Sequence, residues 1–307
     1  VVIWTTTPWT MPGNRAVAFG KHIEYSLIRV KSVAEDSLAI TNEKILIAND
    51  LIEIFSNETK IIDFEMISKI SNSDFEGLIL RHPLYEFGYD YDVPLLEADF
   101  VTTEQGTGFV HIAPGHGSDD FDLGVKYSLP LIETVEDDGY LKEILPVYGG
   151  LHVLRDNEKI ADLMMKKNAL IGRGSLVHSY PHSWRSKAPL IFRTTPQWFI
   201  SMEKNDLRKL ALKSIDDTKF FPDQGANRLS SMIKDRPDWC ISRQRAWGVP
   251  IAIFYHKETL EPLRDQNVLN RIVESFKKEG ADAWFSKSGK YFLGDDYNPE
   301  DYIKVND

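Results

Sequence analysis

Five short runs of β-forming residues occupy the first 115 residues, and polar, turn-rich stretches separate them. Short strands at this spacing are typical of a compact barrel or sandwich. The chain has 307 residues, which is enough for two domains. We therefore expect a mixed α/β fold (α+β) that begins with a β-barrel-like domain with peripheral helices. The runs are residues 15–20, 25–30, 37–41, 77–80 and 106–114.

Helical patterns lie between and after these runs. Ser118 is a suitable N-cap for one of them, which places Asp119 and Asp120 in its first turn. The helix over residues 156–168 looks like a connector, so we place a domain boundary after residue 175. A strand-like, aromatic block follows at residues 175–202. The expected helices cover residues 41–55, 117–129, 156–168, 203–216 and 270–280.

Charge is distributed unevenly along the chain. Residues 1–150 carry 10 Lys and Arg against 25 Asp and Glu, whereas residues 151–307 carry 26 against 21. No acidic residue lies between Asp162 and Glu203, and basic residues are interleaved there with aromatic ones. Such a stretch suits single-stranded RNA, whose bases stack on aromatic rings. The alternative is a buried interdomain segment with a few solvated charges.

Cysteine content and hydropathy exclude several classes of protein. Cys240 is the only cysteine, so the chain can form neither an internal disulfide nor a tetrathiolate zinc site. A reducing, cytoplasmic setting fits this usage best. No apolar run approaches the roughly 18 residues that a membrane-spanning helix needs.

Polar side chains are concentrated in the first fourteen residues, around Trp4 and Trp9. Hydroxyl and amide groups in a segment broken by Pro8 and Pro12 indicate the lining of a small polar pocket. This segment can form only one side of such a pocket, so another segment of the chain must form the other side. Its members are Thr5, Thr6, Thr7, Thr10 and Asn14.

The second polar concentration is the stretch GTGFVHIAPGHGSDDF. Gly106 and Gly108 would let a flat group lie against bare backbone, and we expect His111 to face the Asp120 carboxylate. A carboxylate at a helix start would receive an ammonium group. A metal site built from these histidines and aspartates is the alternative, although the helical HExxH arrangement is absent. We assign His116 to turn structure.

These stretches and two later segments occur in the order seen in one enzyme family. The pair WTTTPWTMPGN and GTGFVHIAPGHGSDDF closely resembles the editing domain of isoleucyl-tRNA synthetases, an insertion in the class I catalytic core. The segments YPHSWRSKAPLIFRTTPQWFISM and RPDWCISRQRAWGVPI resemble the return into the catalytic domain. Valine and leucine enzymes have an arginine in the threonine-rich stretch and lack the histidine at His111. The resemblance covers residues 1–255, with departures at Met11 and Gly13.

The resemblance implies an editing domain at residues 1–175 and a smaller α/β segment of the class I catalytic core at residues 176–307. The implied activity is hydrolysis of mischarged Val-tRNA(Ile) after transfer, with Ile-tRNA(Ile) excluded, and editing before transfer stays open. Asp120 would hold the α-ammonium group, and His111 would help to bar isoleucine. The implied partners are the 3′ CCA end of tRNA(Ile) and its valyl-adenosine moiety, bound by a monomer.

The same resemblance assigns candidate roles to individual residues. The candidate catalytic residues are Thr5, Thr6, Thr7, Asn14, His111 and Asp120. The candidate substrate-binding residues are Trp4, Thr10, Gly106, Thr107, Gly108, Val110 and Ala113. The candidate tRNA contacts are Arg185, Arg193, Trp198, Arg243, Arg245 and Trp247.

We expect the editing reaction to need no metal and no cofactor. Water positioned by threonine hydroxyls and by the substrate's own ribose hydroxyl can attack an ester. The full-length enzyme would use ATP and Mg, but the HIGH and KMSKS signatures are absent from this sequence, so we expect no aminoacylation from it. Two alternatives are a non-catalytic module that binds the tRNA 3′ end and a metal-dependent hydrolase that uses His111 and His116.

Overall fold

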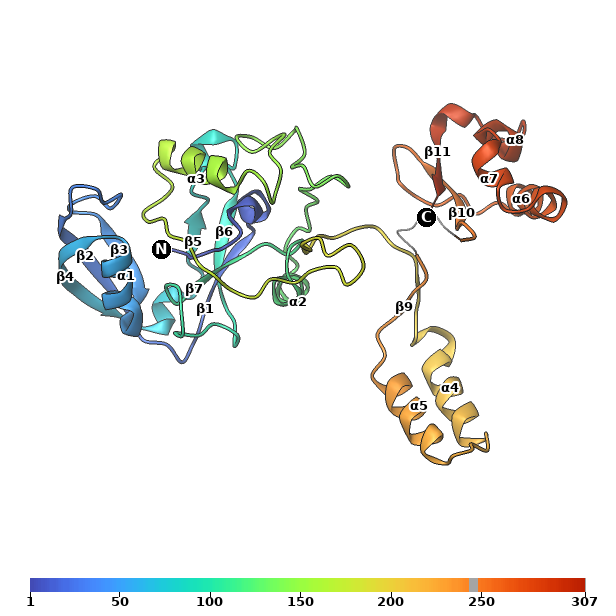
Figure 1. Cartoon of the computed structure of the whole chain (residues 1–307), viewed down its shortest axis with the longest axis horizontal. Helices are drawn as coiled ribbons and strands as arrows, with labels where there is room; N and C mark the ends of the chain where they lie inside the picture. The colour runs from blue at the N-terminus through green and yellow to red at the C-terminus, as the bar shows by residue number, and fades with distance from the viewer. Residues whose placement is uncertain (243–247, 307) are drawn as a thin grey trace. The chain divides into compact units, whose positions relative to one another are not determined.

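The structure is a computed structural model that describes residues 1–242 and 248–306. The chain forms two compact units, Val1–Thr195 and Pro196–Asp307. Both units contain helices and strands (Figure 1), so the chain has the mixed α/β class that the sequence predicts. Residues 176–195, which lie beyond the predicted domain boundary, belong to the first unit.

A four-stranded sheet with the order β5-β6-β1-β7 lies in the first unit. Its strand β1 pairs in parallel with β6 and antiparallel with β7. Val17 and Phe19 of β1 enter one core, and Ala16 and Ala18 enter another, so the strand is buried on both faces. Such a strand needs apolar residues throughout. The bounds are β1 Ala16–Phe19, β5 Ile79–Arg81, β6 Asp92–Glu97 and β7 Phe109–Ile112.

A second, antiparallel sheet has the order β3-β2-β4. The predicted helix over residues 41–55 is wrong in its first part, where β3 forms, and helix α1 begins only at Ile52. Ile45 and Ile47 are buried, β-branched and two positions apart, so a strand paired with β2 satisfies them better than a helix does. The strand predicted at residues 37–41 does not form. The bounds are β2 Tyr25–Val33, β3 Lys44–Ala48, β4 Ile61–Ile70 and α1 Ile52–Glu58.

The expected barrel is not closed. In the part of the chain that the structure describes, β3 and β4 are the edges of one sheet and β5 and β7 are the edges of the other. No strand ladder joins these edges, so the β elements form two open sheets. The helices predicted near residues 118 and 157 are confirmed as α2 Ser118–Lys126 and α3 Asn157–Lys166. Short 3-10 helices are η1 Pro8–Gly13, η2 Asn49–Leu51, η3 Asn72–Phe75 and η4 Tyr85–Phe87.

The second unit contains two two-stranded sheets and five α-helices among its described residues. β8 pairs with β9, and β10 pairs with β11, where Phe254 packs with Trp284 and Phe292 in a small core. The helices predicted at residues 203–216 and 270–280 are confirmed as α4 and α6. The bounds are β8 Phe199–Ile200, η5 Lys204–Asp206, α4 Leu207–Asp216, α5 Gln224–Lys234, β9 Trp239–Cys240, β10 Ala252–His256, α6 Gln266–Glu279, α7 Ala283–Ser286, α8 Gly289–Leu293, η6 Pro299–Asp301 and β11 Tyr302–Asn306.

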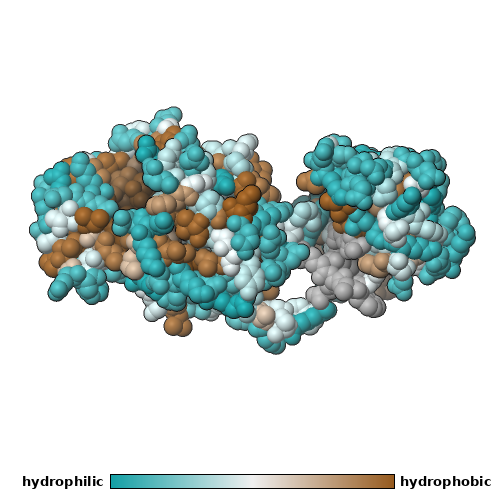
Figure 2. All heavy atoms as spheres, turned by 90° about the horizontal axis from the view of Figure 1, so that it is seen from above, coloured by the Kyte–Doolittle hydropathy of each residue, from teal (hydrophilic) through white to brown (hydrophobic). Residues whose placement is uncertain are grey.

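The strand-like block predicted at residues 175–202 is mostly irregular. Within it, the structure has only β8 and an isolated bridge between His182 and Pro189. Prolines such as Pro181 and Pro196 lack an N–H, which interrupts a strand ladder. On the surface of the first unit, hydrophobic residues form patches among hydrophilic ones (Figure 2). Every helix within the described ranges is too short or too polar to cross a membrane.

Candidate active site

The threonine-rich segment folds into a turn that leads into η1. The backbone amide of Thr7 donates to Thr5 Oγ1 at 3.0 Å, and the amide of Thr10 donates to Thr7 O at 3.0 Å. Pro8 opens η1, a position where its missing N–H leaves no helical bond unmade. Thr5 and Thr7 are half-buried and Thr6 is exposed, so the turn keeps hydroxyl groups at the surface.

His111 of β7 is hydrogen-bonded at both ring nitrogens. Asn14 Nδ2 donates to Ala16 O at 3.0 Å and to His111 Nδ1 at 2.8 Å. Thr10 Oγ1 donates its hydrogen to Thr7 O at 2.9 Å, so it must accept one from His111 Nε2 at 2.8 Å. His111 is therefore the neutral tautomer with its proton on Nε2. Burial lowers the pKa of His111 to about 3, which keeps the ring neutral at physiological pH.

This buried triad joins the two polar stretches of the sequence. Thr10, Asn14 and His111 are 4%, 2% and 8% exposed, and the Thr10 hydroxyl and the Asn14 amide nitrogen both bond to the His111 ring. The structure thus brings three predicted site residues together. Because neither ring nitrogen is free, His111 can act on a ligand through the shape of its ring and not through proton exchange.

Asp120 lies in the first turn of α2, as the sequence predicts. The N-cap of α2 is Gly117, whereas Ser118 is the first helical residue and makes no capping hydrogen bond; the predicted cap is therefore one residue off. Asp120 Oδ2 accepts from the amide of Ala113 at 2.8 Å. Burial raises the pKa of Asp120 to about 6, and the Ala113 bond opposes that rise. A half-buried carboxylate is suited to bind an ammonium group.

The GTG turn lies against the start of the chain. The Thr107 hydroxyl donates to Val2 O at 2.6 Å, and Gly106 at φ +84° packs beside Trp4. Gly108 has φ +79°, and a Cβ there would lie 2.4 Å from Ala48 Cβ, so only glycine fits. The predicted pairing of the two polar stretches is thus present in the backbone as well. Of the other candidate binding residues, Val110 is half-buried and Ala113 is buried.

His116 lies in a turn, as the sequence predicts, and its ring also contacts two residues that are distant in sequence. Its amide donates to Ala113 O at 2.8 Å. Its ring contacts Thr134 Oγ1 at 2.7 Å and Phe192 O at 3.0 Å. Thr134 and Phe192 were not among the predicted site residues, because a backbone carbonyl and a single distant threonine carry no local sequence signal.

The candidate tRNA contacts are distributed over both units and the residues outside the described ranges. Arg185 is exposed and lies over the Trp184 ring, with 4.6 Å between Cζ and the ring centroid. Arg193 donates to Val135 O at 3.1 Å and pairs with Asp137. Trp198 belongs to the second unit. The remaining candidates, which fall outside the described residues, are Arg243, Arg245 and Trp247.

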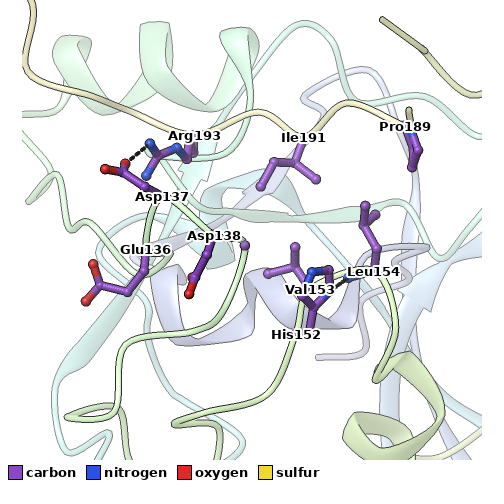
Figure 3. Close-up of a pocket in the computed structure, with 10 residues that line it drawn as sticks. Glu136, Asp137, Asp138, His152, Val153, Leu154, Pro189, Ile191 and Arg193 are labelled. Atoms are coloured by element: carbon purple, nitrogen blue, oxygen red, sulfur yellow. Dashed lines mark hydrogen bonds and ion pairs between the residues drawn. The ribbon is translucent and has the colours of Figure 1, made fainter. Parts of the chain in front are cut away.

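A separate open pocket of about 240 Å³ lies beside the segment that contains Pro189, Ile191 and Arg193. Figure 3 shows Arg193 turned toward Asp137 and away from His152. Of the predicted site residues that the structure describes, only Arg193 lines this pocket. The threonines, His111 and Asp120 do not line this pocket.

The donor set at the site does not match a metal centre. Both ring nitrogens of His111 and of His116 already have protein partners. Within residues 1–242 and 248–306, no group of three His, Cys, Asp or Glu side chains is arranged to hold a metal ion. The site offers instead a half-buried carboxylate, surface threonine hydroxyls and a neutral histidine ring.

Comparison with known proteins gives consistent matches. Residues 14–307 match the family model described as tRNA synthetases class I (I, L, M and V). Isoleucine–tRNA ligase of Pelagibacter ubique is 51% identical over 307 residues, and that of Gluconobacter oxydans is 47% identical over 318 residues. Each match covers 100% of this chain but only 34% and 33% of the relative, so the chain spans about a third of their length.

One solved structure, titled "The crystal structure of GlLeuRS-CP1", resembles the chain with a TM-score of 0.44 and 17% sequence identity. The match covers 56% of this chain and 83% of that chain.

Proposed function

The chain belongs to the class I tRNA synthetases, and we propose that its first unit hydrolyses the ester of mischarged Val-tRNA(Ile) while excluding Ile-tRNA(Ile). The observation that carries the proposal is the buried triad of Thr10, Asn14 and His111, which fixes the threonine turn to the strand preceding the half-buried Asp120.

The need for such a site is physical. Valine lacks one methylene of isoleucine, and a hydrophobic pocket gains only about 1–3 kcal/mol from that difference, of which these two amino acids are the standard example. A second site that admits valine and rejects isoleucine supplies the missing discrimination. A rigid, neutral ring such as that of His111 suits the rejecting wall, because its two hydrogen bonds prevent it from moving aside.

The proposed reaction uses orientation in place of a strong base. Asp120 binds the α-ammonium group, and the hydroxyls of Thr5, Thr6 and Thr7 position a water molecule. The water oxygen bonds to the valyl carbonyl carbon, the ester bond to the ribose breaks, and the released ribose oxygen takes the proton. Holding water and ester in this geometry supplies much of the rate. Trp4, Gly106 and Thr107 are proposed to receive the terminal adenosine.

Release of [³H]valine from Val-tRNA(Ile) by the whole chain tests this proposal, with Ile-tRNA(Ile) as the paired substrate. We expect release of valine and retention of isoleucine, and loss of the activity in Asp120→Ala. Hydrolysis of both esters at equal rates, or of neither by folded protein with intact tRNA bound, would refute it.

A non-catalytic module that binds the tRNA 3′ end is the alternative, and binding without release in the same assay would favour it. A metal-dependent hydrolase is a further alternative, which activity in the presence of a chelator would remove. Ligation of isoleucine to tRNA(Ile) with ATP and Mg is proposed for a longer enzyme only. Hydrolysis of valyl-adenylate, a cytoplasmic location and a monomeric state are further parts of the proposal. No step above uses ATP or Mg.

A further inference from the structure

The loop from Ala113 to Gly117 holds the Asp120 carboxylate at both of its ends. The Ala113 amide donates to Asp120 Oδ2 at 2.8 Å. At the other end, a Cβ on Gly117 would lie 3.1 Å from Asp120 Oδ1, so bare backbone packs against the carboxylate. The position of this loop therefore sets the environment of Asp120.

Two distant segments enclose the loop. A Cβ on Gly115 would lie 3.1 Å from Ile132 O and 3.5 Å from Thr194 Oγ1, so the loop lies between the chain near Ile132 and the chain near Thr194. The second of these segments ends the first unit at Thr195. The loop thus contacts the segment through which the chain passes to the second unit.

The ring of His116 is bonded to both enclosing segments. Because Phe192 O can only accept, Nδ1 carries the proton and donates to it at 3.0 Å. Nε2 then accepts from the hydroxyl of the buried Thr134 at 2.7 Å. The Trp9 ring meets the imidazole edge-on at 5.0 Å between centroids, and a Cβ on Gly13 would lie 3.1 Å from its Cδ2. One side chain therefore fastens the loop to three other parts of the first unit.

We propose that His116 is a positioning residue, which holds the Ala113–Gly117 loop so that the Asp120 carboxylate keeps its half-buried place, and makes that place depend on the Phe192–Thr194 segment. This positioning role adds to the hydrolysis proposed above, and it rests on that proposal only where the test measures hydrolysis. The groups that face Asp120 include the like charge of Asp119, while burial lowers the pKa of His116 and keeps its ring neutral.

Two substitutions test the two hydrogen bonds of the His116 ring independently. His116→Asn places an amide N–H near the position of Nδ1 and keeps the bond to Phe192 O, whereas His116→Gln reaches Thr134 and gives up the bond to Phe192. We expect His116→Gln to lower kcat for Val-tRNA(Ile) about 10²-fold, the size of effect that a displacement near 1 Å produces, and His116→Asn to lower it less. His22→Gln, at an exposed histidine, is the matched control and should leave kcat unchanged.

A role in positioning Asp120 also moves the pH profile. A loosened loop admits water to the carboxylate, so the acid limb of the kcat profile in His116→Gln should shift down by about one pH unit. Thr134→Val, which is nearly isosteric, should shift it in the same direction and serves if His116→Gln does not fold. An unchanged limb and unchanged kcat in folded variants, with only the melting temperature lowered, would show a purely structural role and overturn the proposal.

A direct titration keeps this inference separate from the proposed function. The ¹³C carboxyl shift of Asp120, followed against pH in the whole chain, should titrate lower in His116→Gln than in the unaltered protein. If the unaltered chain does not release valine, the proposed hydrolysis fails while this titration still decides the role of His116. An Asp120 titration that is identical in the two proteins refutes the positioning role whatever the activity.

Discussion

Replacing Asp120 with asparagine should make the protein more stable and less active. Burial holds the pKa of Asp120 at about 6, against an ordinary value of 3.8. The folded state therefore keeps the proton up to a higher pH than the unfolded state does, and stability falls as pH rises between these two values. Above about pH 6, the charged carboxylate is a cost to folding that asparagine lacks.

The size of this cost follows from the two pKa values. A difference of about two units corresponds to about 3 kcal/mol at most, since each unit is worth about 1.36 kcal/mol. Asp120 is only half-buried, so we expect Asp120→Asn to raise the free energy of unfolding by about 1–3 kcal/mol at pH 7.5. Near pH 4 the advantage should shrink to about 0.6 kcal/mol, because the carboxyl is then protonated in the folded state and about half protonated in the unfolded state.

Urea unfolding of the whole chain at the two pH values, followed by tryptophan fluorescence, measures the difference. Asp119→Asn, at an exposed position in the same helical turn, is the matched control and should change stability by less than about 0.5 kcal/mol. If Asp120→Asn changes the free energy of unfolding by the same amount at both pH values, or makes the protein less stable at pH 7.5, then burial of the charged carboxylate does not destabilise the folded state.

Three further predictions follow from the same geometry. Hydrolysis of Val-tRNA(Ile) should decline as pH falls through about 6, because protonated Asp120 no longer attracts the ammonium group; a flat rate from pH 5 to 8 contradicts this role. His111→Ala should open the site, so that isoleucine is released from Ile-tRNA(Ile); full protection of that ester would remove His111 from the rejecting wall. Gly108→Ala should lower stability by about 3 kcal/mol or more, because the new Cβ meets Ala48 at 2.4 Å as well as a positive φ, whereas Gly77→Ala, with φ +73° and open space, should cost about 1 kcal/mol. Equal thermal shifts in these two glycine variants would contradict that packing argument.

The sequence predicts the site better than the sheets around it. The place of Asp120 in the first turn of α2 follows from residue chemistry, and the structure has it there. Residue types and motif resemblance also predict that the two polar stretches lie together, but not that Thr10 bonds to His111. The helix predicted through Ile45 and Ile47 is wrong, because an apolar run of that length fits both periods and only pairing with β2 decides between them. Whether the strands close into a barrel likewise depends on which sheet edges pair, and no local sequence pattern specifies that pairing.

Some contributions to the site are invisible to motif analysis for a physical reason. Phe192 acts through its carbonyl oxygen, which every residue possesses, so its side chain gives no indication of the bond to His116. Thr134 is one buried hydroxyl among many threonines, and its role depends on a partner 18 positions away. Such contacts depend on how distant segments fold next to one another, and no short stretch of the sequence determines that.

The separation between Thr10 and His111 also bears on how the protein folds. The two residues lie 101 positions apart, and Asn14 reaches the same ring over 97 positions. Contacts of such long range form late, since the intervening chain must be ordered before they contribute. During synthesis, a chain that ends before β7 has the threonine turn but lacks the His111 ring to which Thr10 and Asn14 bond. The bonds between the threonine turn and His111 therefore form only when β7 takes its place beside β1.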